Sequence, residues 1–319
     1  MSFCAENQPA GLILFTRNCV TPDQVCRLTE DFKSAVGSAE IFVLIDQEGG
    51  RVKRLAPPVW PEFPPARAFG ELYETSAERG LEAARLTSQL LASSLLQLGI
   101  NVNTVPVLDI PVPGAHDIIG DRAYGCDGDV IAAIGEAVAK GHMAAGVLPV
   151  VKHIPGHGRA TADSHECLPV VAASREELSQ LDFIPFRALR HLPLAMTAHI
   201  VYSQIDPEAP ASLSTLIING VIRDELGFDG VLMSDDLSMG ALSGSLAERT
   251  RAVLGAGCDL ALHCNGDMDE MCQVAEASPE IGRDSAKRIA AAFARIEIQE
   301  EFDVDRAKAI LAEAFDLHW

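Results

Sequence analysis

Seven short apolar runs, separated by helical patterns, recur along this chain. The runs are residues 11–15, 41–45, 100–107, 147–151, 193–196, 230–233 and 258–262. Helix start signals lie between them, such as the capping boxes that begin at Thr21 and Ser174, and an Ala/Leu-rich stretch covers residues 76–98. Strands that are apolar along their whole length and alternate with helices predict an α/β fold, with a parallel sheet covered by helices.

The residues that follow these runs help to distinguish an open sheet from a closed barrel. An open, doubly wound sheet concentrates its ligands at one switch point, whereas a barrel gathers the carboxyl ends of all its strands around one mouth. Here nearly every run is followed by polar side chains. They are Arg17, Asn18, Asp46, Glu48, Asp109, Lys152, His153, His199, Asp235, Asp236, His263 and Asn265. This distribution favours a (β/α)8 barrel of the TIM type.

The number of runs is one fewer than such a barrel needs. The chain after Asn265 reads as helix to Trp319, and residues 1–9 are too polar to form a strand. We therefore expect a barrel whose first strand is absent or altered. No linker, repeat or low-complexity tract divides the sequence, which predicts one domain over residues 1–319.

Composition excludes several classes of function. The net charge of −20 predicts repulsion from phosphate backbones and anionic membranes, so neither nucleic acid nor a membrane is an expected partner. No apolar run approaches the ~20 residues of a membrane span. The N-terminus shows no basic segment followed by a long apolar stretch, so we expect a cytoplasmic protein. The eight cysteines form no Cys-x-x-Cys pair, which indicates reduced thiols and argues against structural zinc. The sequence does not determine the oligomeric state.

Residues 152–165, called the histidine loop below, concentrate chemistry in one short segment. They hold three imidazoles with Lys152 and Asp163, and Pro155, Gly156 and Gly158 exclude a helix. Asp163 and His165 stand two residues apart, so they point the same way in extended backbone and can pair. A metal-hydrolase interpretation would use His153, His157, Asp163 and His165 as ligands. The Lys152 ammonium argues against it, because it raises the cost of bringing in a cation.

A second segment, residues 221–239, ends a strand in the paired acids Asp235 and Asp236. Together with the histidine loop it resembles glycoside hydrolase family 3, and more closely that family's single-domain bacterial beta-N-acetylhexosaminidases. The resemblance extends to residues 11–18, 46–52, 120–122, 196–199 and 210–212. It implies a (β/α)8 barrel, which agrees with the pattern of strands.

The resemblance also implies roles for single residues. It makes Asp235 the nucleophile of a retaining hydrolysis, with Asp236 as the competing candidate, and it makes His165 the acid/base, oriented by Asp163. A histidine can exchange protons near pH 7, and an adjacent carboxylate stabilises the imidazolium. The matched sugar-binding positions are Asp46, Arg54, Arg122, Lys152 and His153. For Asp46 and Arg54 a structural ion pair is the alternative, while His157 and His199 are expected to support the site.

The function implied is that of a cytoplasmic, exo-acting beta-N-acetylglucosaminidase. Its small carbohydrate substrate would be an anhydromuropeptide of cell-wall recycling, and no metal or organic cofactor is expected. A beta-glucosidase of the same family and a non-catalytic aminosugar-binding protein are the alternatives. Water and phosphate both stay open as the acceptor.

Overall fold

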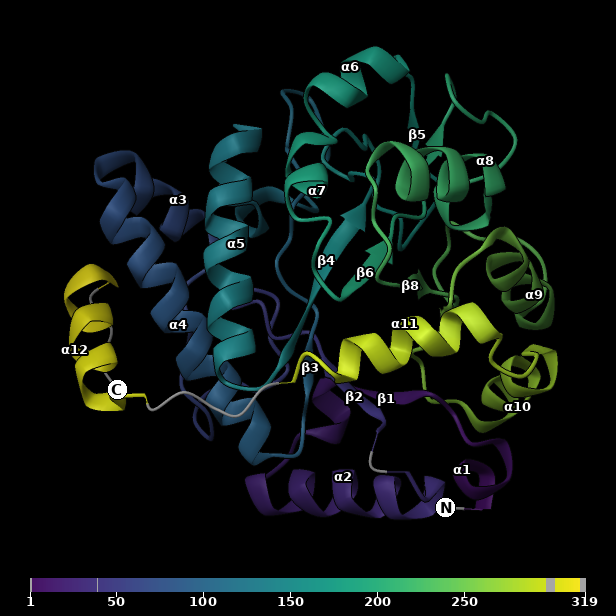
Figure 1. Cartoon of the computed structure of the whole chain (residues 1–319), viewed down its shortest axis with the longest axis horizontal. Helices are drawn as coiled ribbons and strands as arrows, with labels where there is room; N and C mark the ends of the chain where they lie inside the picture. Colours follow the sequence, from purple (N-terminus) through teal and green to yellow (C-terminus); the bar gives the residue numbers. More distant parts are fainter. Residues whose placement is uncertain (1, 39, 297–301, 316–319) are drawn as a thin grey trace. The chain divides into compact units, whose positions relative to one another are not determined.

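The computed structural model describes residues 2–38, 40–296 and 302–315. Its chain divides into two compact units. Unit 1 consists of Met1–Pro106, Ala133–Val150 and Phe293–Trp319, and unit 2 consists of Val107–Ala132 and Val151–Ala292. The elements of each unit are labelled in Figure 1.

Unit 1 pairs its strands in parallel. It contains α1 (Ser2–Asn7), β1 (Gly11–Leu14), η1 (Thr16–Asn18), α2 (Pro22–Val36), β2 (Phe42–Ile45), α3 (Ala66–Thr75), α4 (Ala77–Gln97), β3 (Val102–Asn103), most of α5 (Gly128–Ala144), the first residues of β4 (Leu148–Ile154) and α12 (Val304–Phe315). Gly11 pairs with Phe42, Ile45 with Asn103, and Val102 with Leu148. Residues 42–45 are all buried, as expected for a strand covered on both faces.

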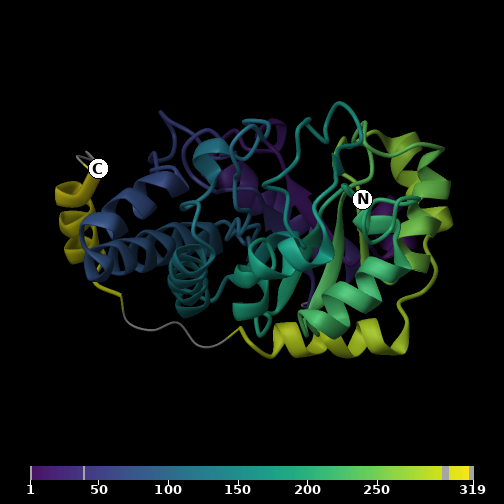
Figure 2. The same cartoon turned by 90° about the horizontal axis from the view of Figure 1, so that it is seen from above.

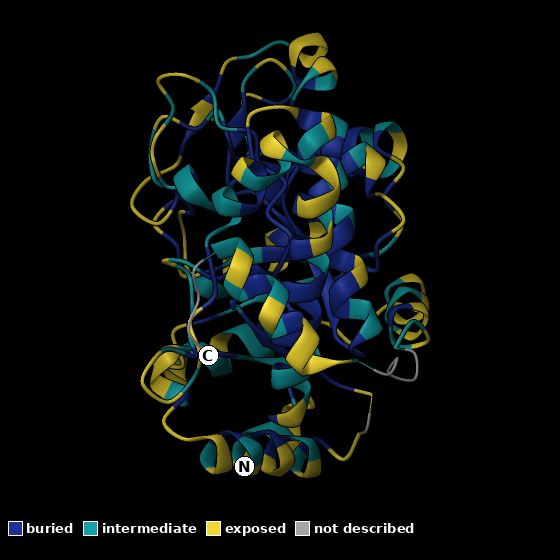
Figure 3. Cartoon of the chain, turned by 90° about the vertical axis from the view of Figure 1, so that its left-hand side faces the viewer, coloured by how far each residue is buried: buried dark blue, intermediate teal, exposed yellow. Residues whose placement is uncertain are grey.

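Figure 3 colours the chain by burial. α2 buries Val25, Thr29, Phe32 and Val36 along one side, whereas α4 is buried on all sides over residues 86–92. α3 and α12 both pack on α4, which can be followed in Figures 1 and 2. Phe69 of α3 meets Phe315 of α12 edge to face, with ring centroids 5.1 Å apart. The N-cap predicted at Thr21 is present, since its side chain accepts a hydrogen bond from Gln24 N at the start of α2. The reciprocal bond of a capping box does not form, because the Gln24 side chain accepts from Val20 N.

Unit 2 also consists of parallel strands and helices. It contains η2 (Gly120–Arg122), the end of β4, β5 (Val170–Val171), α6 (Arg175–Gln180), α7 (Ile184–Ala188), β6 (Leu194–Thr197), β7 (Val201–Tyr202), η3 (Ala211–Leu213), α8 (Thr215–Ile217), the π-helical η4 (Ile218–Glu225), β8 (Val231–Asp236), α9 (Leu246–Ala256), β9 (Leu260–Leu262), α10 (Met268–Ala277) and nearly all of α11 (Arg283–Phe293). Leu194 pairs with Val231, and Met233 with Leu260. The short strands β5 and β7 form a separate parallel pair, which the sequence did not predict.

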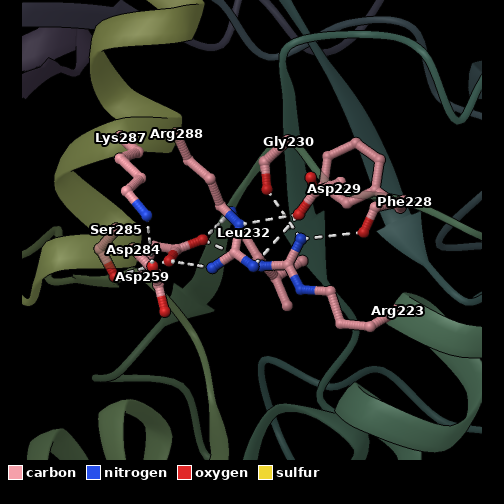
Figure 4. A network of polar contacts seen from close by, with 10 residues as sticks. All are labelled: Arg223, Phe228, Asp229, Gly230, Leu232, Asp259, Asp284, Ser285, Lys287 and Arg288. Carbon is pink, nitrogen blue, oxygen red and sulfur yellow. Dashed lines mark hydrogen bonds and ion pairs between the residues drawn. The ribbon is translucent and has the colours of Figure 1, made fainter.

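A buried carboxylate anchors α11 within unit 2 (Figure 4). Asp259 accepts hydrogen bonds from Arg223 Nη2 at 2.9 Å and from Leu232 N at 2.9 Å. From α11 it also accepts bonds from Ser285 Oγ at 2.6 Å and Arg288 Nη1 at 3.1 Å. Asp259, which directly precedes β9, therefore links Arg288 and Ser285 of α11 to Arg223 of η4 and to the backbone of β8.

The hydrogen-bonded strand order is β1-β2-β3-β4-β6-β8-β9. Each of the seven predicted apolar runs supplies one of these strands, and Ser2–Asn7 form a helix, in agreement with the expectation that residues 1–9 form no strand. The described residues thus form an α/β fold with a parallel seven-stranded sheet. Closure into a (β/α)8 barrel and the single-domain interpretation stay predictions. Among the described residues, no helix is both long and apolar enough to cross a membrane.

Candidate active site

A buried carboxylate, Asp109, lies at the centre of the polar groups of unit 2. The segment before it runs beside the end of β4, where Leu108 N donates to Lys152 O at 2.7 Å. Asp109 is fully buried and accepts a hydrogen bond from His153 Nδ1 at 2.6 Å and another from His157 N at 2.6 Å. Burial raises the pKa of Asp109, but the charges and hydrogen bonds of the two histidines lower it more, so its pKa lies below the usual value.

The two histidines meet edge to face, with ring centroids 5.5 Å apart. His153 Nδ1 carries a proton, because a carboxylate can only accept. Burial and the charge of His153 lower the pKa of His157 to about 4, so His157 is neutral at neutral pH. Its Nε2 lies 3.0 Å from Ser164 Oγ, which ties the two halves of the histidine loop together.

The acid Asp235 lies at the carboxyl end of β8 and is partly exposed. Burial raises the pKa of its carboxyl. Electrostatic interactions with His153 and His199, the Asp236 backbone N–H and the Lys152 ammonium lower it more, so the pKa lies below the usual value. Asp235 Oδ1 accepts the Asp236 N–H at 2.8 Å. A carboxylate held ionised in a partly buried site is suited to act as a nucleophile or to stabilise a cation.

The neighbouring acid, Asp236, is engaged with backbone groups. Its Oδ1 accepts from Ser238 N at 3.0 Å and from Cys264 N at 3.1 Å, and its Oδ2 accepts from Ser238 Oγ. These bonds hold the turn after β8. The contrast between the two acids favours Asp235 over Asp236 as the reactive carboxylate.

His199, at the exit of β6, supports the same turn. Its Nε2 lies 3.1 Å from the Asp236 carbonyl oxygen and its Nδ1 lies 2.7 Å from Ser212 Oγ. Since a carbonyl oxygen only accepts, Nε2 carries the proton and Nδ1 accepts from the serine. Burial lowers the pKa of His199, so the neutral ring is favoured. His199 is therefore a satisfied buried histidine beside Asp235.

Asp163 and His165 form the predicted pair. His165 Nδ1 and His165 N both donate to Asp163 Oδ1 at 2.8 Å. Burial raises the pKa of Asp163, while these bonds lower it more, so the carboxylate is favoured. The imidazole is exposed, and its second nitrogen, Nε2, is left to exchange a proton.

The pair is attached to the segment that follows Asp235. Gly240 N donates to His165 O at 3.0 Å and Ala241 N donates to Ser164 O at 3.1 Å. A Cβ at Gly240 would lie 2.6 Å from Glu166 O and 2.8 Å from His165 O, so this close approach requires glycine. Gly158 is equally constrained, since a Cβ there would lie 1.9 Å from Ile110 O.

The remaining predicted residues fall in both units. Lys152 is buried at the end of β4, and Arg122 in η2 donates from Nη1 to Ile118 O at 3.2 Å. Asp46 and Arg54 belong to unit 1 and form an ion pair of 2.8 Å, in which Arg54 Nη2 donates to Asp46 Oδ2. Thr104 Oγ1 also donates to Asp46, and Arg54 lies over the Phe15 ring, 4.8 Å from its centroid.

Unit 2 thus contains six of the eight predicted site residues, and unit 1 contains the other two. The sequence interpretation missed the central role of Asp109 as the hydrogen-bond acceptor for two histidines. Its signal was an acid directly after a strand, but nothing local to it indicated two histidine partners 44 and 48 residues away. Ser164 and Ser212 were missed for the same reason. Within the described part of the chain, no three His, Cys, Asp or Glu residues are arranged to hold a metal ion.

Comparison with known proteins adds to this geometry. The family model described as the glycosyl hydrolase family 3 N terminal domain matches residues 2–298. A beta-hexosaminidase of Thiobacillus denitrificans is 40% identical over 259 residues, which cover 80% of this chain and 71% of that protein.

Two solved structures are similar over nearly the whole chain. A glycoside hydrolase family 3 beta-N-acetylglucosaminidase from Paenibacillus matches with a TM-score of 0.85 and 32% identity, over 98% of this chain and 63% of that one. This chain therefore spans less than two thirds of that protein. NagZ from Neisseria gonorrhoeae, in complex with N-trifluoroacetyl-D-glucosamine, matches with a TM-score of 0.84 and 30% identity, over 96% of this chain and 90% of that one.

Proposed function

This chain belongs to glycoside hydrolase family 3 and is a glycoside hydrolase with beta-hexosaminidase relatives, and from this premise we propose the reaction that it catalyses. It is an exo-acting beta-N-acetylglucosaminidase that hydrolyses terminal, non-reducing N-acetylglucosamine with retention of anomeric configuration. The nucleophile is Asp235, and the acid/base is the His165–Asp163 pair.

One observation carries the proposal. The two adjacent acids of β8 differ in availability, because Asp236 accepts two backbone N–H groups, whereas Asp235 accepts one and has electrostatic interactions with Lys152 and His153 that lower its pKa. Those interactions favour the ionised form that attacks the anomeric carbon. A covalent glycosyl-enzyme then divides one difficult displacement into two easier ones.

The His165–Asp163 pair supports the proton transfers of both steps. With Nδ1–H donating to Asp163, the neutral ring accepts at Nε2 and the imidazolium donates from it. In the first step Nε2–H protonates the leaving oxygen. In the second step Nε2 takes a proton from water, which returns the histidine to its starting state.

The substrate is proposed from chemistry and from relatives. The N-acylglucosamine bound to the NagZ relative supports N-acetylglucosamine as the sugar bound here. The residues proposed to bind it are Arg122, Lys152 and His153 of unit 2, with Asp46 and Arg54 of unit 1. Carboxylate and cationic donors can discriminate between sugar epimers, because a misplaced hydroxyl leaves buried polar groups unpaired. We also propose that the natural substrates are anhydromuropeptides, that the chain folds as a (β/α)8 barrel and that the protein is cytoplasmic. The eight cysteines are all free, which supports a reducing compartment.

The experiment compares Asp235→Asn with Asp236→Asn on an aryl N-acetyl-beta-glucosaminide. Asp235→Asn should lower kcat by about 1,000-fold or more, because an amide is a poor nucleophile, while N-acetylglucosamine still binds. Asp236→Asn should mainly lower the Tm. A 5-fluoro analogue of the N-acetylglucosaminyl donor should trap the glycosyl-enzyme, and peptide mass spectrometry should locate it on Asp235.

Three outcomes would overturn parts of the proposal. Label on another residue would remove Asp235 as the nucleophile. Faster cleavage of an aryl beta-glucoside would indicate a beta-glucosidase. Binding of N-acetylglucosamine without turnover of either glycoside would indicate a sugar-binding protein.

A further inference from the structure

His142, a buried histidine on α5, uses both of its ring nitrogens. Nδ1 lies 3.0 Å from Val138 O, and Nε2 lies 3.0 Å from Asn103 Nδ2. Burial lowers the pKa of His142 to about 4, so the ring is neutral at neutral pH. The Val138 carbonyl only accepts, so Nδ1 carries the single ring proton and Nε2 is an acceptor.

This tautomer and the Gln47 backbone together fix which way the Asn103 amide faces. An acceptor at His142 Nε2 requires a donor opposite it, which is Asn103 Nδ2. The same Nδ2 donates its other hydrogen to Gln47 O at 2.9 Å, and Asn103 Oδ1 accepts from Gln47 N at 3.0 Å. A flipped amide would oppose acceptor to acceptor at two of these contacts and donor to donor at the third. His142 therefore permits one orientation of a side chain that is fully buried.

Asn103 in turn holds the backbone beside Asp46. Its side-chain amide hydrogen-bonds both the N–H and the C=O of the Gln47 backbone. The next residue, Thr104, donates from its N–H to Ile45 O at 3.0 Å and from its hydroxyl to Asp46. The end of β3 thus fixes the backbone on both sides of Asp46.

The same contacts continue to the arginine of the pair. Gln47 Oε1 accepts from Arg54 N at 2.8 Å and from Leu55 N at 3.0 Å, and Gln47 Nε2 donates to Leu55 O at 2.9 Å. Gln47 follows Asp46 directly in sequence, and its side chain hydrogen-bonds the backbone at Arg54 and Leu55. It therefore connects the two members of the Asp46–Arg54 pair. Every one of these contacts lies within unit 1.

We infer that His142 is a positioning residue for the Asp46–Arg54 pair, acting through the Asn103 amide and Gln47. The inference rests on the proposed function, in which that pair binds the sugar. A buried side chain needed only for packing would not have to be polar, whereas this one supplies the acceptor that orients the next amide.

Two amide variants that differ by one methylene test the relay. In His142→Gln the amide oxygen reaches the position of Nε2 and still accepts from Asn103. In His142→Asn the side chain keeps a donor for Val138 O but is too short to reach Asn103. We expect His142→Asn to raise KM for an aryl N-acetyl-beta-glucosaminide about tenfold with kcat within about twofold, and His142→Gln to keep KM within about threefold of the wild-type value.

The two variants are then combined with Asp46→Asn. If His142 acts through Asp46, His142→Asn should raise KM less than about twofold in the Asp46→Asn background. An equal KM increase in both backgrounds, or equal KM values for the two His142 variants, would overturn the inference. Thermal unfolding of each variant identifies a KM change that arises from partial unfolding.

Failure of the proposed function would appear separately, as a wild-type protein without turnover. In that case the affinity for N-acetylglucosamine, measured by calorimetry, replaces KM in the same comparison. ¹⁵N NMR of the wild-type protein provides a further readout, because it should show His142 neutral and protonated on Nδ1 at pH 6. Protonation on Nε2 would contradict the relay whatever the activity.

Discussion

Asp109 places one buried negative charge between two histidines of the candidate active site. Its carboxylate accepts from His153 Nδ1 and from the backbone of His157, so it sets the tautomer of one ring and the position of the other. The two histidines compensate the cost of burying this charge. Asp109 therefore organises the site without being a proposed reacting group.

The Asp109→Asn variant tests whether the Asp109 carboxylate is needed to position His153 and His157. The amide keeps the shape but cannot accept every bond, so its NH₂ group opposes a histidine donor. We expect kcat/KM to fall about 100-fold and the Tm to fall with it. Steady-state kinetics and calorimetry measure both, and wild-type activity in Asp109→Asn would show that the charge is not needed.

At the scale of elements, the histidine loop is positioned by the turn that follows β8. The backbone bonds from Gly240 and Ala241 to the loop bring the Asp163–His165 pair to the strand that carries Asp235. Two segments about 75 residues apart in sequence thus share one short contact, and Gly240 is the residue that permits it.

Gly240→Ala should therefore impair chemistry more than stability. The new Cβ would meet the carbonyl oxygens of residues 165 and 166 and move His165, the proposed acid/base, which should lower kcat about ten- to a hundredfold. Gly255→Ala in α9 is the control, because nothing lies within 4 Å of its Cβ, and it should stabilise the helix by about 0.5–1 kcal/mol. Equal kcat values for the two variants would contradict this account.

α11 depends on a charge cluster rather than on apolar packing alone. Asp259 has a side chain that is only 2% exposed and serves Arg223, Arg288 and Ser285 together. Asp259→Ala would leave two arginines without their shared anion, and we expect the free energy of unfolding to fall by about 3–5 kcal/mol. Lys287→Ala removes an exposed pair with Asp284 and should cost less than about 0.5 kcal/mol in urea unfolding. A similar loss of unfolding free energy in both variants would show that Asp259 does not anchor α11.

At the scale of the whole molecule, buried neutral histidines make stability depend on pH. His142 and His157 each have a folded-state pKa of about 4, below the value of about 6.5 expected in the unfolded chain. Between these values the unfolded chain binds more protons, so stability falls as the pH falls.

The expected slope is about 1.4 kcal/mol per pH unit for each histidine, between pH 6.5 and about 4. His142→Gln removes one titrating group and should reduce the slope by about that amount. Urea unfolding of the wild type and the variant at pH 6.5, 5.5 and 4.5 measures the difference. Parallel stability curves for the two proteins would show that His142 is not buried in its neutral form.

Much of the architecture could be predicted because its signals are local. A strand of four apolar residues and a cap such as Thr21 are encoded within a few positions, so all seven runs, the helix over residues 76–98 and the capping box at Ser174 agree with the structure. At Thr21 the N-cap bond forms, but the Gln24 side chain accepts from Val20 N instead of Thr21 N, so the predicted box is not completed. The two-residue strands β5 and β7 were missed, because so short a pair has no periodicity to detect.

From the sequence alone it could be predicted that polar, potentially reactive residues follow the strands, since residue type and strand pattern are both local properties of the chain. The contacts between these residues became visible only in the folded chain. The tertiary structure distinguished an available Asp235 from an engaged Asp236, placed Asp109 under two histidines, and connected His142 to Asp46 through Asn103. The physical reason is that a hydrogen bond depends on the direction and burial of both partners, and these partners meet only after strands distant in sequence have paired.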